Sequence, residues 1–370
     1  MQRRHLLQLA TSSALMPSAM ASSTPCHLHV GSYAPQGQGI YRFAISADGD
    51  LKPLGVTADA GSPSWLVAHA GRVYAAEEGA DHIAVYTPDS GGALRLLHRE
   101  PSGGKGPVHL SVGAGRVWVA HYGDSRFAAL PVQAEGGLGT AVTWRSCDAD
   151  CSPGPTKPLK APPGSQASSG HEAPHAHAIQ LSPDGRWIVG TDLGRDRLLV
   201  WPLTDAAPKT LVHELVLSAG SGPRHFVFHP QDAGLVYVLQ EESSTLSTVA
   251  LTAGGPQLLD EISVLPAGFE GTSYASDLLV APGGRHLYAL GRLHDSIGVL
   301  SLDKPRAPRL LDHHWVHGNY PRSACIAGSW MYVCNQRSDQ LSHFDVSRPE
   351  APRFTGRQTG VPSPAGACWL

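Results

Sequence analysis

The sequence has little charge and few aromatic residues: Asp, Glu, Lys and Arg make up 16% of its 370 residues, and Phe, Trp and Tyr 7%. The formal net charge is −3, and no segment is rich in Lys or Arg, which argues against binding to nucleic acid through its phosphates. No run of about 20 apolar residues occurs, so we expect no membrane-spanning helix. Long stretches of Ala, Glu, Lys and Leu are also missing, which argues against a helical fold.

Glycine and proline are abundant instead, with 41 Gly and 30 Pro. This composition is typical of short strands joined by turns, and we expect an all-β protein. One pattern recurs: a turn with Gly, Pro or Ser, a short strand, a second turn, and a strand rich in Val, Tyr and Trp. Its seven starts are "GSPSWLVA" from Gly61, "GPVHLSVG" from Gly106, "PHAHAIQL" from Pro174, "GPRHFVFH" from Gly222, "SYASDLLV" from Ser273, "YPRSACIA" from Tyr320 and "PSPAGACW" from Pro362.

The spacing of these starts predicts a seven-bladed β-propeller. Successive starts lie 45, 68, 48, 51, 47 and 42 residues apart, close to the length of a four-stranded blade except in the second interval. That interval contains residues 147–174, rich in Pro, Gly and Ser, which we interpret as an inserted surface loop. The seventh start is followed by no further strand, whereas the N-terminal "HLHVGSY" and "GIYRFAIS" resemble second and third strands without a first. We therefore expect one propeller domain over residues 22–370, closed by pairing of the N- and C-terminal strands.

The first 21 residues are typical of a signal peptide. Arg3 and Arg4 form a basic start, Leu6 to Met16 a short apolar region, and Ala19-Met20-Ala21 a cleavage site between small residues. The arginine pair also resembles a twin-arginine signal. We expect a periplasmic or secreted protein.

Six cysteines fit an oxidising compartment. Cys147 and Cys151 could form a small disulfide loop. Cys26 and Cys368 would lie on neighbouring strands of the closing blade, where a disulfide forms only if the register allows it. Cys325 and Cys334 flank a predicted hairpin. They could form a disulfide bridge, or both could be buried free thiols.

Polar side chains recur at the blade starts, which in a propeller surround one mouth of the central channel. The starts contribute His109, His175, His177, Arg224, His225, Asp277 and Arg322, and the ends of the second strands add Glu77, Glu78, His121, Tyr122, Glu241, Glu242, Arg292, Asn335 and Gln336. Each has a structural alternative, since strand histidines often pack, arginines bind carbonyl groups, and acids lie on solvated faces. A zinc site at His171, His175 and His177 is the weaker interpretation because no carboxylate follows at a fixed spacing.

Four segments carry a resemblance to a known family. "PHAHAIQLSPDGRWIVGTDLGRDRLLVW", "GSGPRHFVFHP", "SYASDLLVAPGGRHLYALGRLHDSIGVL" and "CNQRSDQLSHFDV" resemble the seven-bladed propeller lactonases, which include the bacterial propeller type of 6-phosphogluconolactonase and the fungal carboxy-muconate lactonizing enzyme. The resemblance implies catalytic roles for His177, Arg224, Glu241 and Arg292. Arg292 follows Gly291, where relatives more usually have Asn or Asp. The candidate substrate-binding residues are His175, His225, Asp277, Arg322, Asn335 and Gln336.

Lactone hydrolysis suits these residue types, because it needs a base for water and fixed positive donors for the oxyanion. His177 or Glu241 could be the base, and Arg224 and Arg292 could bind the oxyanion or a substrate anion. No G-x-S-x-G motif or P-loop occurs. We predict a monomeric, metal- and cofactor-independent hydrolase of an anionic sugar-acid lactone. The alternative is an exported, non-catalytic propeller that binds a small anion or a protein.

Overall fold

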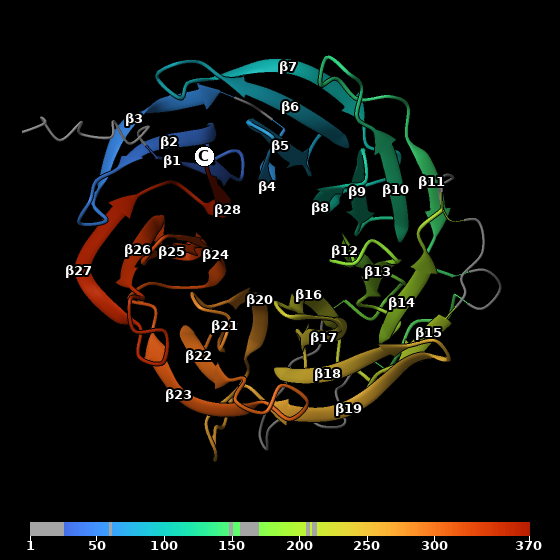
Figure 1. Cartoon of the computed structure of the whole chain (residues 1–370). Helices are drawn as coiled ribbons and strands as arrows, with labels where there is room; N and C mark the ends of the chain where they lie inside the picture. The colour runs from blue at the N-terminus through green and yellow to red at the C-terminus, as the bar shows by residue number, and fades with distance from the viewer. Residues whose placement is uncertain (1–25, 59–60, 148–150, 156–169, 205–207, 209–212) are drawn as a thin grey trace, which may run out of the picture.

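The computed structural model describes residues 26–370 except 59–60, 148–150, 156–169, 205–207 and 209–212. Within them, seven four-stranded antiparallel sheets surround a central channel (Figure 1). The predicted all-β, seven-bladed propeller is thus confirmed. The predicted signal peptide lies outside the described residues. No helix in the described part of the chain has the length and apolar character needed to cross a bilayer.

The blades follow one another along the chain, and each runs from an inner to an outer strand. The closing blade consists of β28 (Pro364–Trp369), β1 (His27–Ser32), β2 (Gly39–Ile45) and β3 (Leu51–Ala58). The next two are β4 (Pro63–His69), β5 (Arg72–Glu77), β6 (His82–Pro88) and β7 (Leu94–Pro101), then β8 (Pro107–Gly113), β9 (Arg116–His121), β10 (Arg126–Pro131) and β11 (Val142–Arg145). They are followed by β12 (Ala176–Leu181), β13 (Trp187–Asp192), β14 (Arg197–Pro202) and β15 (His213–Val216), and by β16 (Pro223–His229), β17 (Asp232–Gln240), β18 (Thr245–Thr252) and β19 (Gly255–Ser263). The last two are β20 (Tyr274–Val280), β21 (His286–Arg292), β22 (Ser296–Ser301) and β23 (Arg309–Trp315), then β24 (Pro321–Ala327), β25 (Trp330–Asn335), β26 (Gln340–Asp345) and β27 (Arg353–Gly360), with a single 3-10 turn, η1 (Gln336–Ser338), after β25.

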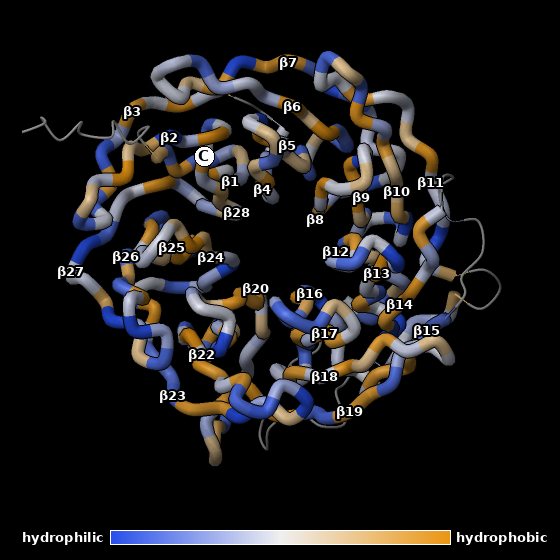
Figure 2. Tube along the Cα trace, in the orientation of Figure 1, coloured by the Kyte–Doolittle hydropathy of each residue, from blue (hydrophilic) through white to orange (hydrophobic). Residues whose placement is uncertain are grey.

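Burial follows position within the blade. The second strands are buried along most of their length, for example β9, whereas the outer strands alternate exposed and partly buried residues. Figure 2 shows hydrophilic stretches along the outer ring, for instance on β23 and β27. Apolar side chains therefore fill the space between neighbouring blades and leave the inner strands free to line the channel.

The seven predicted starts correspond to the seven inner strands. Each inner strand begins one or two residues after its predicted start. All seven run away from one mouth of the channel, and each second strand returns antiparallel to it. The beginning of a first strand and the end of a second strand therefore share one mouth, as the sequence predicted. Residues 147–174, the predicted insertion, lie between β11 and β12.

The ring closes through β1 and β28, with Leu28 opposite Trp369 and His29 opposite Cys368. This register corrects one expectation about the cysteines. Cys368 faces His29 and not Cys26, so a Cys26–Cys368 bridge does not form, and both thiols are free.

The other cysteine pairs differ from each other. Cys325 faces Tyr332 across the hairpin, and Cys334 faces Ser323, so these two cysteines are buried free thiols. The sulfur atoms of Cys147 and Cys151 are at bonding distance, with Cα atoms 5.5 Å apart.

Candidate active site

A β-bulge occurs near the start of every inner strand. The pairing with the neighbouring strand shifts by one residue there, which leaves a residue outside the ladder and redirects its side chain. The residues at these shifts are Ser64, Val108, His177, Arg224, the pair Ser276 and Asp277, Arg322, and Ala365. Four of the predicted site residues therefore occupy equivalent bulges in different blades.

The turn before Arg224 requires glycine. Gly222 has φ +66°, and a Cβ atom there would lie 1.4 Å from Oε2 of Glu242. Its N–H donates to Oδ1 of Asp196 at 2.9 Å, which fixes the turn. The Gly-Pro-Arg-His segment thus enters the sheet at a defined angle and directs Arg224 into the mouth of the channel.

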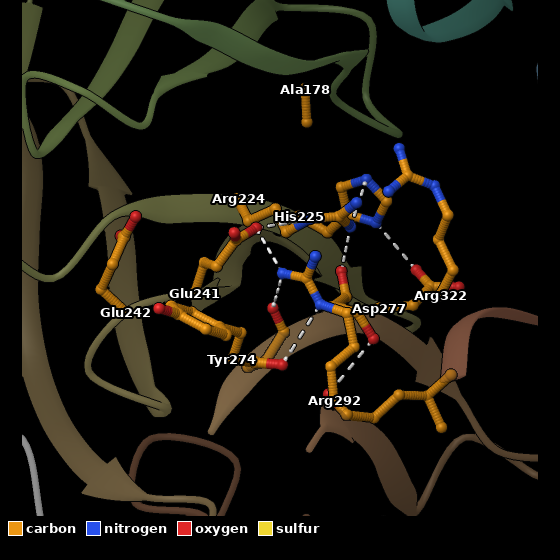
Figure 3. A network of polar contacts seen from close by, with 12 residues as sticks. Ala178, Arg224, His225, Glu241, Glu242, Tyr274, Asp277, Arg292 and Arg322 are labelled. Atoms are coloured by element: carbon orange, nitrogen blue, oxygen red, sulfur yellow. Dashed lines mark hydrogen bonds and ion pairs between the residues drawn. The ribbon is translucent and has the colours of Figure 1, made fainter. Parts of the chain in front are cut away.

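Two arginines bind one carboxylate at the centre of the site (Figure 3). Nε of Arg224 lies 2.9 Å and Nη2 of Arg292 lies 2.7 Å from the same oxygen, Oε2 of Glu241. Burial alone would raise the pKa of Glu241, but the guanidinium groups of Arg292 and Arg224 outweigh it and lower that pKa below its usual value. Burial, together with the charge of Arg292, lowers the pKa of Arg224 to about 10. Arg224 therefore stays charged at neutral pH, and Glu241 stays ionised.

Arg292 is held on several sides. Its Nη2 donates to the carbonyl of Ala275 at 3.1 Å and its Nη1 to the hydroxyl of Tyr320 at 3.3 Å. The guanidinium carbon lies 5.2 Å from the ring centre of Tyr320 and 5.8 Å from that of Tyr274. These contacts fix the orientation of Arg292 although it follows Gly291.

His225 connects Arg224 to a buried acid. Nη1 of Arg224 donates to Nε2 of His225 at 3.1 Å, and Nδ1 of His225 donates to Oδ1 of Asp277 at 2.8 Å. Burial, followed by the charge of Arg224, lowers the pKa of His225 well below its usual value, so the ring is neutral with its proton on Nδ1. Burial raises the pKa of Asp277 to about 6, although the N–H groups of Leu278 and Ala324 donate to it.

His177 lies beside this relay. Its ring centre is 5.2 Å from that of His225 and 5.9 Å from that of Tyr122. Burial, followed by the charge of Arg224, lowers the pKa of His177 well below its usual value. Nδ1 is buried and has no hydrogen-bond partner among the described residues. His177 is therefore a neutral imidazole that contacts His225 and lies within the field of Arg224.

Arg322 approaches the same mouth from β24. Its guanidinium carbon lies 4.9 Å from the ring centre of Tyr33, and its nearest carboxylate oxygen, on Glu78, is 3.9 Å away. The hydroxyl of Tyr33 donates to that oxygen at 2.6 Å. Burial alone would lower the pKa of Arg322, but Tyr33 and Glu78 outweigh it and raise that pKa. Among the described residues, no carboxylate lies closer to this guanidinium.

The remaining predicted residues lie at the edge of the site or outside it. His175 stacks on Tyr122 with ring centres 3.9 Å apart, next to His177. Asn335 is fully buried and donates to the hydroxyl of Ser342 at 2.5 Å within its own blade. Gln336 begins η1, and its N–H donates to the carbonyl of Tyr320. Within the described residues, neither Asn335 nor Gln336 contacts the arginine pair, and their roles stay predictions.

The histidines considered for zinc point to different partners. Nε2 of His171 lies 3.0 Å from Oδ1 of Asp196, and Nδ1 of His175 lies 2.6 Å from the carbonyl of Tyr122. The part of the chain that the structure describes holds no cluster of three or more metal-ligating side chains.

Three aromatic residues of the site were not predicted from the sequence: Tyr33, Tyr274 and Tyr320. Tyr274 begins an inner strand, where five of the other blades carry Pro, and Tyr320 directly precedes one, where most other blades carry Gly or Ser. A tyrosine in that turn position was the available signal. Arg337, also missed, lies with its guanidinium carbon 3.8 Å from the ring centre of Tyr320.

Fold and site together define a propeller with a basic and acidic cluster at one channel mouth, and the chain belongs to the seven-bladed β-propeller lactonase family, whose model matches residues 27–369. A 6-phosphogluconolactonase from Bacillus subtilis is 28% identical over 90% of this chain and 94% of its own length. The structure of a periplasmic gluconolactonase from Pseudomonas aeruginosa has a TM-score of 0.80 and 25% identity, covering 93% of this chain and 99% of its own. A putative 6-phosphogluconolactonase from Bacteroides fragilis has a TM-score of 0.82 at 21% identity, covering 95% of this chain and all of its own, and supports the fold alone.

Proposed function

We propose that this protein hydrolyses a sugar-acid lactone at the mouth formed by His177, Arg224, Glu241 and Arg292. The observation that carries the proposal is the shared Oε2 of Glu241, which fixes two guanidinium groups beside a neutral imidazole. The names of the family and of its relatives support the same activity.

His177 is the proposed general base. Both arginines bind the carboxylate of Glu241, whereas Nδ1 of His177 has no hydrogen-bond partner among the described residues. The neutral ring of His177 accepts a proton from water as the water oxygen attacks the lactone carbonyl carbon. The imidazolium then returns that proton to the ring oxygen when the carbon–oxygen bond of the lactone breaks, which yields the hydroxy acid.

Arg224 is the proposed oxyanion donor. Its Nε faces Glu241, and its Nη1 contacts His225 and the carbonyl of Ser276. Nη2 has no hydrogen-bond partner among the described residues, so it can donate to the negative oxygen of the tetrahedral intermediate. Glu241 and Arg292 hold this guanidinium in place before the substrate binds.

Arg322 is the proposed binding group for a substrate anion. It is charged, partly exposed at the mouth, and 3.9 Å from its nearest carboxylate. A phosphate or carboxylate can therefore displace solvent there and bind the guanidinium fork. One chain supplies every residue of this site, so the predicted monomer suffices, and the mechanism uses side chains only.

An exported location follows from the predicted signal peptide, and the periplasmic gluconolactonase among the structural neighbours supports it. In that compartment the close Cys147–Cys151 pair would persist as a disulfide. Fractionation of cells that express the full chain tests this location.

Hydrolysis of glucono-δ-lactone and its 6-phosphate by the wild-type protein tests the activity. We expect His177→Ala and Arg224→Ala each to lower kcat/KM by roughly 100- to 1,000-fold, as for the loss of one oxyanion donor. Arg285→Ala is the matched control, since Arg285 is exposed in the turn between β20 and β21 and pairs with Asp303. Unchanged activity in both site variants would remove the proposed site. No activity of the wild type on any γ- or δ-lactone would remove the proposed function.

A further inference from the structure

The channel contains a second space below the candidate active site. A cavity of about 810 Å³ lies along the later residues of the inner strands, and its lining includes His69, Val280 and Trp369, which end or nearly end β4, β20 and β28. The site residues lie at the starts of those strands. Because the inner strands run parallel to one another along the channel, this cavity opens toward the opposite mouth.

Three rings, in tilted and edge-on contact, lie at the upper end of this cavity. The ring centres of Trp65 and His109 are 5.0 Å apart, those of Trp65 and His225 are 4.9 Å apart, and those of His109 and His225 are 5.5 Å apart. All three side chains line the lower cavity, whereas Arg224, Glu241 and Arg292 do not. The arginine pair and Glu241 are therefore not part of the lower cavity.

The walls of the lower cavity are mainly apolar. They include Val67, Val227, Leu279, Ile326 and Ala367, and Trp369 is 46% exposed. Among the described residues that line the cavity, none is Lys or Arg, and Asp277 is the one with a carboxylate side chain. Both oxygens of Asp277 already accept hydrogen bonds, from His225 and Leu278 on one side and from Ala324 on the other. The charge pattern therefore disfavours an anion and offers no open partner for a cation.

Two ring N–H groups of residues that line this end have no hydrogen-bond partner among the described residues: Nε1 of Trp65 and Nε2 of His109. The backbone N–H of Ile179 donates to Nδ1 of His109 at 3.4 Å, which leaves the ring proton on Nε2. His109 therefore offers an N–H donor above an apolar wall. Burial keeps its ring neutral by lowering its pKa well below the usual value.

We propose that the lower cavity is a separate binding site for an uncharged, mostly apolar small molecule with one hydrogen-bond acceptor, such as a medium-chain alcohol. The apolar walls bind the chain, and Nε2 of His109 donates to the hydroxyl oxygen. Its volume lies within the range of pockets that enclose small ligands. The cavity shares His225 and Asp277 with the relay beside Arg224, but its lining does not include Arg224, Glu241 or Arg292.

Fluorescence of N-phenyl-1-naphthylamine, an uncharged apolar probe, tests the site on the wild-type protein. We expect saturable binding with one probe per chain, displacement by 1-octanol, and at least ten-fold weaker displacement by octanoate at pH 8. Leu279→Trp fills the cavity and should weaken probe binding at least ten-fold. Leu96→Trp, at an exposed position on outer strand β7, is the matched control and should bind like the wild type.

His109→Phe tests the hydrogen-bond donor alone, because it removes Nε2 and keeps an aromatic ring in contact with Trp65 and His225. We expect three- to ten-fold weaker 1-octanol binding with unchanged probe binding. The proposal is overturned by absent or non-saturable probe binding, by octanoate competing as well as 1-octanol, or by unchanged probe binding in the cavity-filling variant. If circular dichroism shows that Leu279→Trp does not fold, Ile326→Phe on the neighbouring inner strand β24 provides the same measurement.

Discussion

Arg224 and Arg292 come from different blades and contact the same oxygen of Glu241, at 2.9 and 2.7 Å. Two like charges at this distance would repel each other in a buried site without the carboxylate between them. Glu241 therefore holds the cationic pair together, and the pair in turn keeps Glu241 ionised.

Glu241→Gln should destabilise the protein by about 3 kcal/mol, because it leaves two buried guanidinium groups without a carboxylate. Lactone hydrolysis should fall as well, but its pH profile between pH 5 and 8 should keep its shape, since the lowered pKa of Glu241 places its titration below that range. Urea unfolding measures the loss of stability, and kcat/KM at several pH values gives the pH profile of lactone hydrolysis. Glu350→Gln, at an exposed pair with Arg348, is the control. Loss of a limb of the pH profile in Glu241→Gln would instead identify Glu241 as the base.

Tyr320→Ala should lower kcat/KM about ten-fold, because Arg292 loses both the ring beside its guanidinium and the hydroxyl at 3.3 Å. Tyr320→Phe keeps the ring and should stay within about three-fold of the wild type, since only one long hydrogen bond is lost. Steady-state kinetics of the two variants separate these contributions. Equal losses in both would assign the effect to the hydroxyl.

The fold was predictable because the repeat is visible in the sequence. Gly, Pro and Ser mark each turn, and seven starts at near-regular spacing leave one four-stranded blade to be completed by the two ends of the chain. The position of the candidate site was predictable for the same reason, since closure of the ring brings His177, Arg224, Glu241 and Arg292 to one mouth of the channel.

The parts that could not be predicted depend on register. The register of β1 against β28 decides whether Cys26 or His29 faces Cys368. This register includes a shift of the pairing between Gly31 and Ser32. The bulges that redirect His177 and Arg224 are likewise properties of the paired strands and carry no residue signature of their own.

Asp277→Asn should change how stability depends on pH. The pKa of Asp277 is raised to about 6, so the folded state binds a proton that the unfolded state releases between about pH 4 and 6. The wild type should therefore lose up to about 3 kcal/mol relative to the variant as pH rises through this window, and the difference should be constant above it. Urea unfolding at pH 4, 5, 6 and 7 measures the difference, with Asp303→Asn as an exposed control. A pH-independent difference would show that Asp277 titrates normally.

Gly222→Ala should cost well over about 2 kcal/mol of stability, because a methyl group adds left-handed strain and overlaps the carboxylate of Glu242. Gly185→Ala is the matched control: Gly185 has φ +69°, and no described atom lies within 4 Å of the point that an added methyl group would occupy. Its cost should be about 1 kcal/mol from strain alone. Thermal unfolding compares the two. Equal costs would mean that the Gly-Pro-Arg-His turn relaxes without disturbing Glu242.

Arg322→Ala should raise KM for a phosphorylated lactone by about ten-fold or more and change KM for the unphosphorylated lactone by less than about three-fold. The reason is that its guanidinium has no carboxylate among the described residues closer than 3.9 Å, whereas Arg224 and Arg292 are both engaged by Glu241. Tyr33→Phe is the accompanying control, since it keeps the ring under Arg322 and removes only the bond to Glu78. KM is measured for both lactones with the wild type and the variant, and the KM increases for the two substrates are compared. Equal KM increases for the two substrates would place Arg322 outside anion recognition and assign it to the packing of Tyr33 and Glu78.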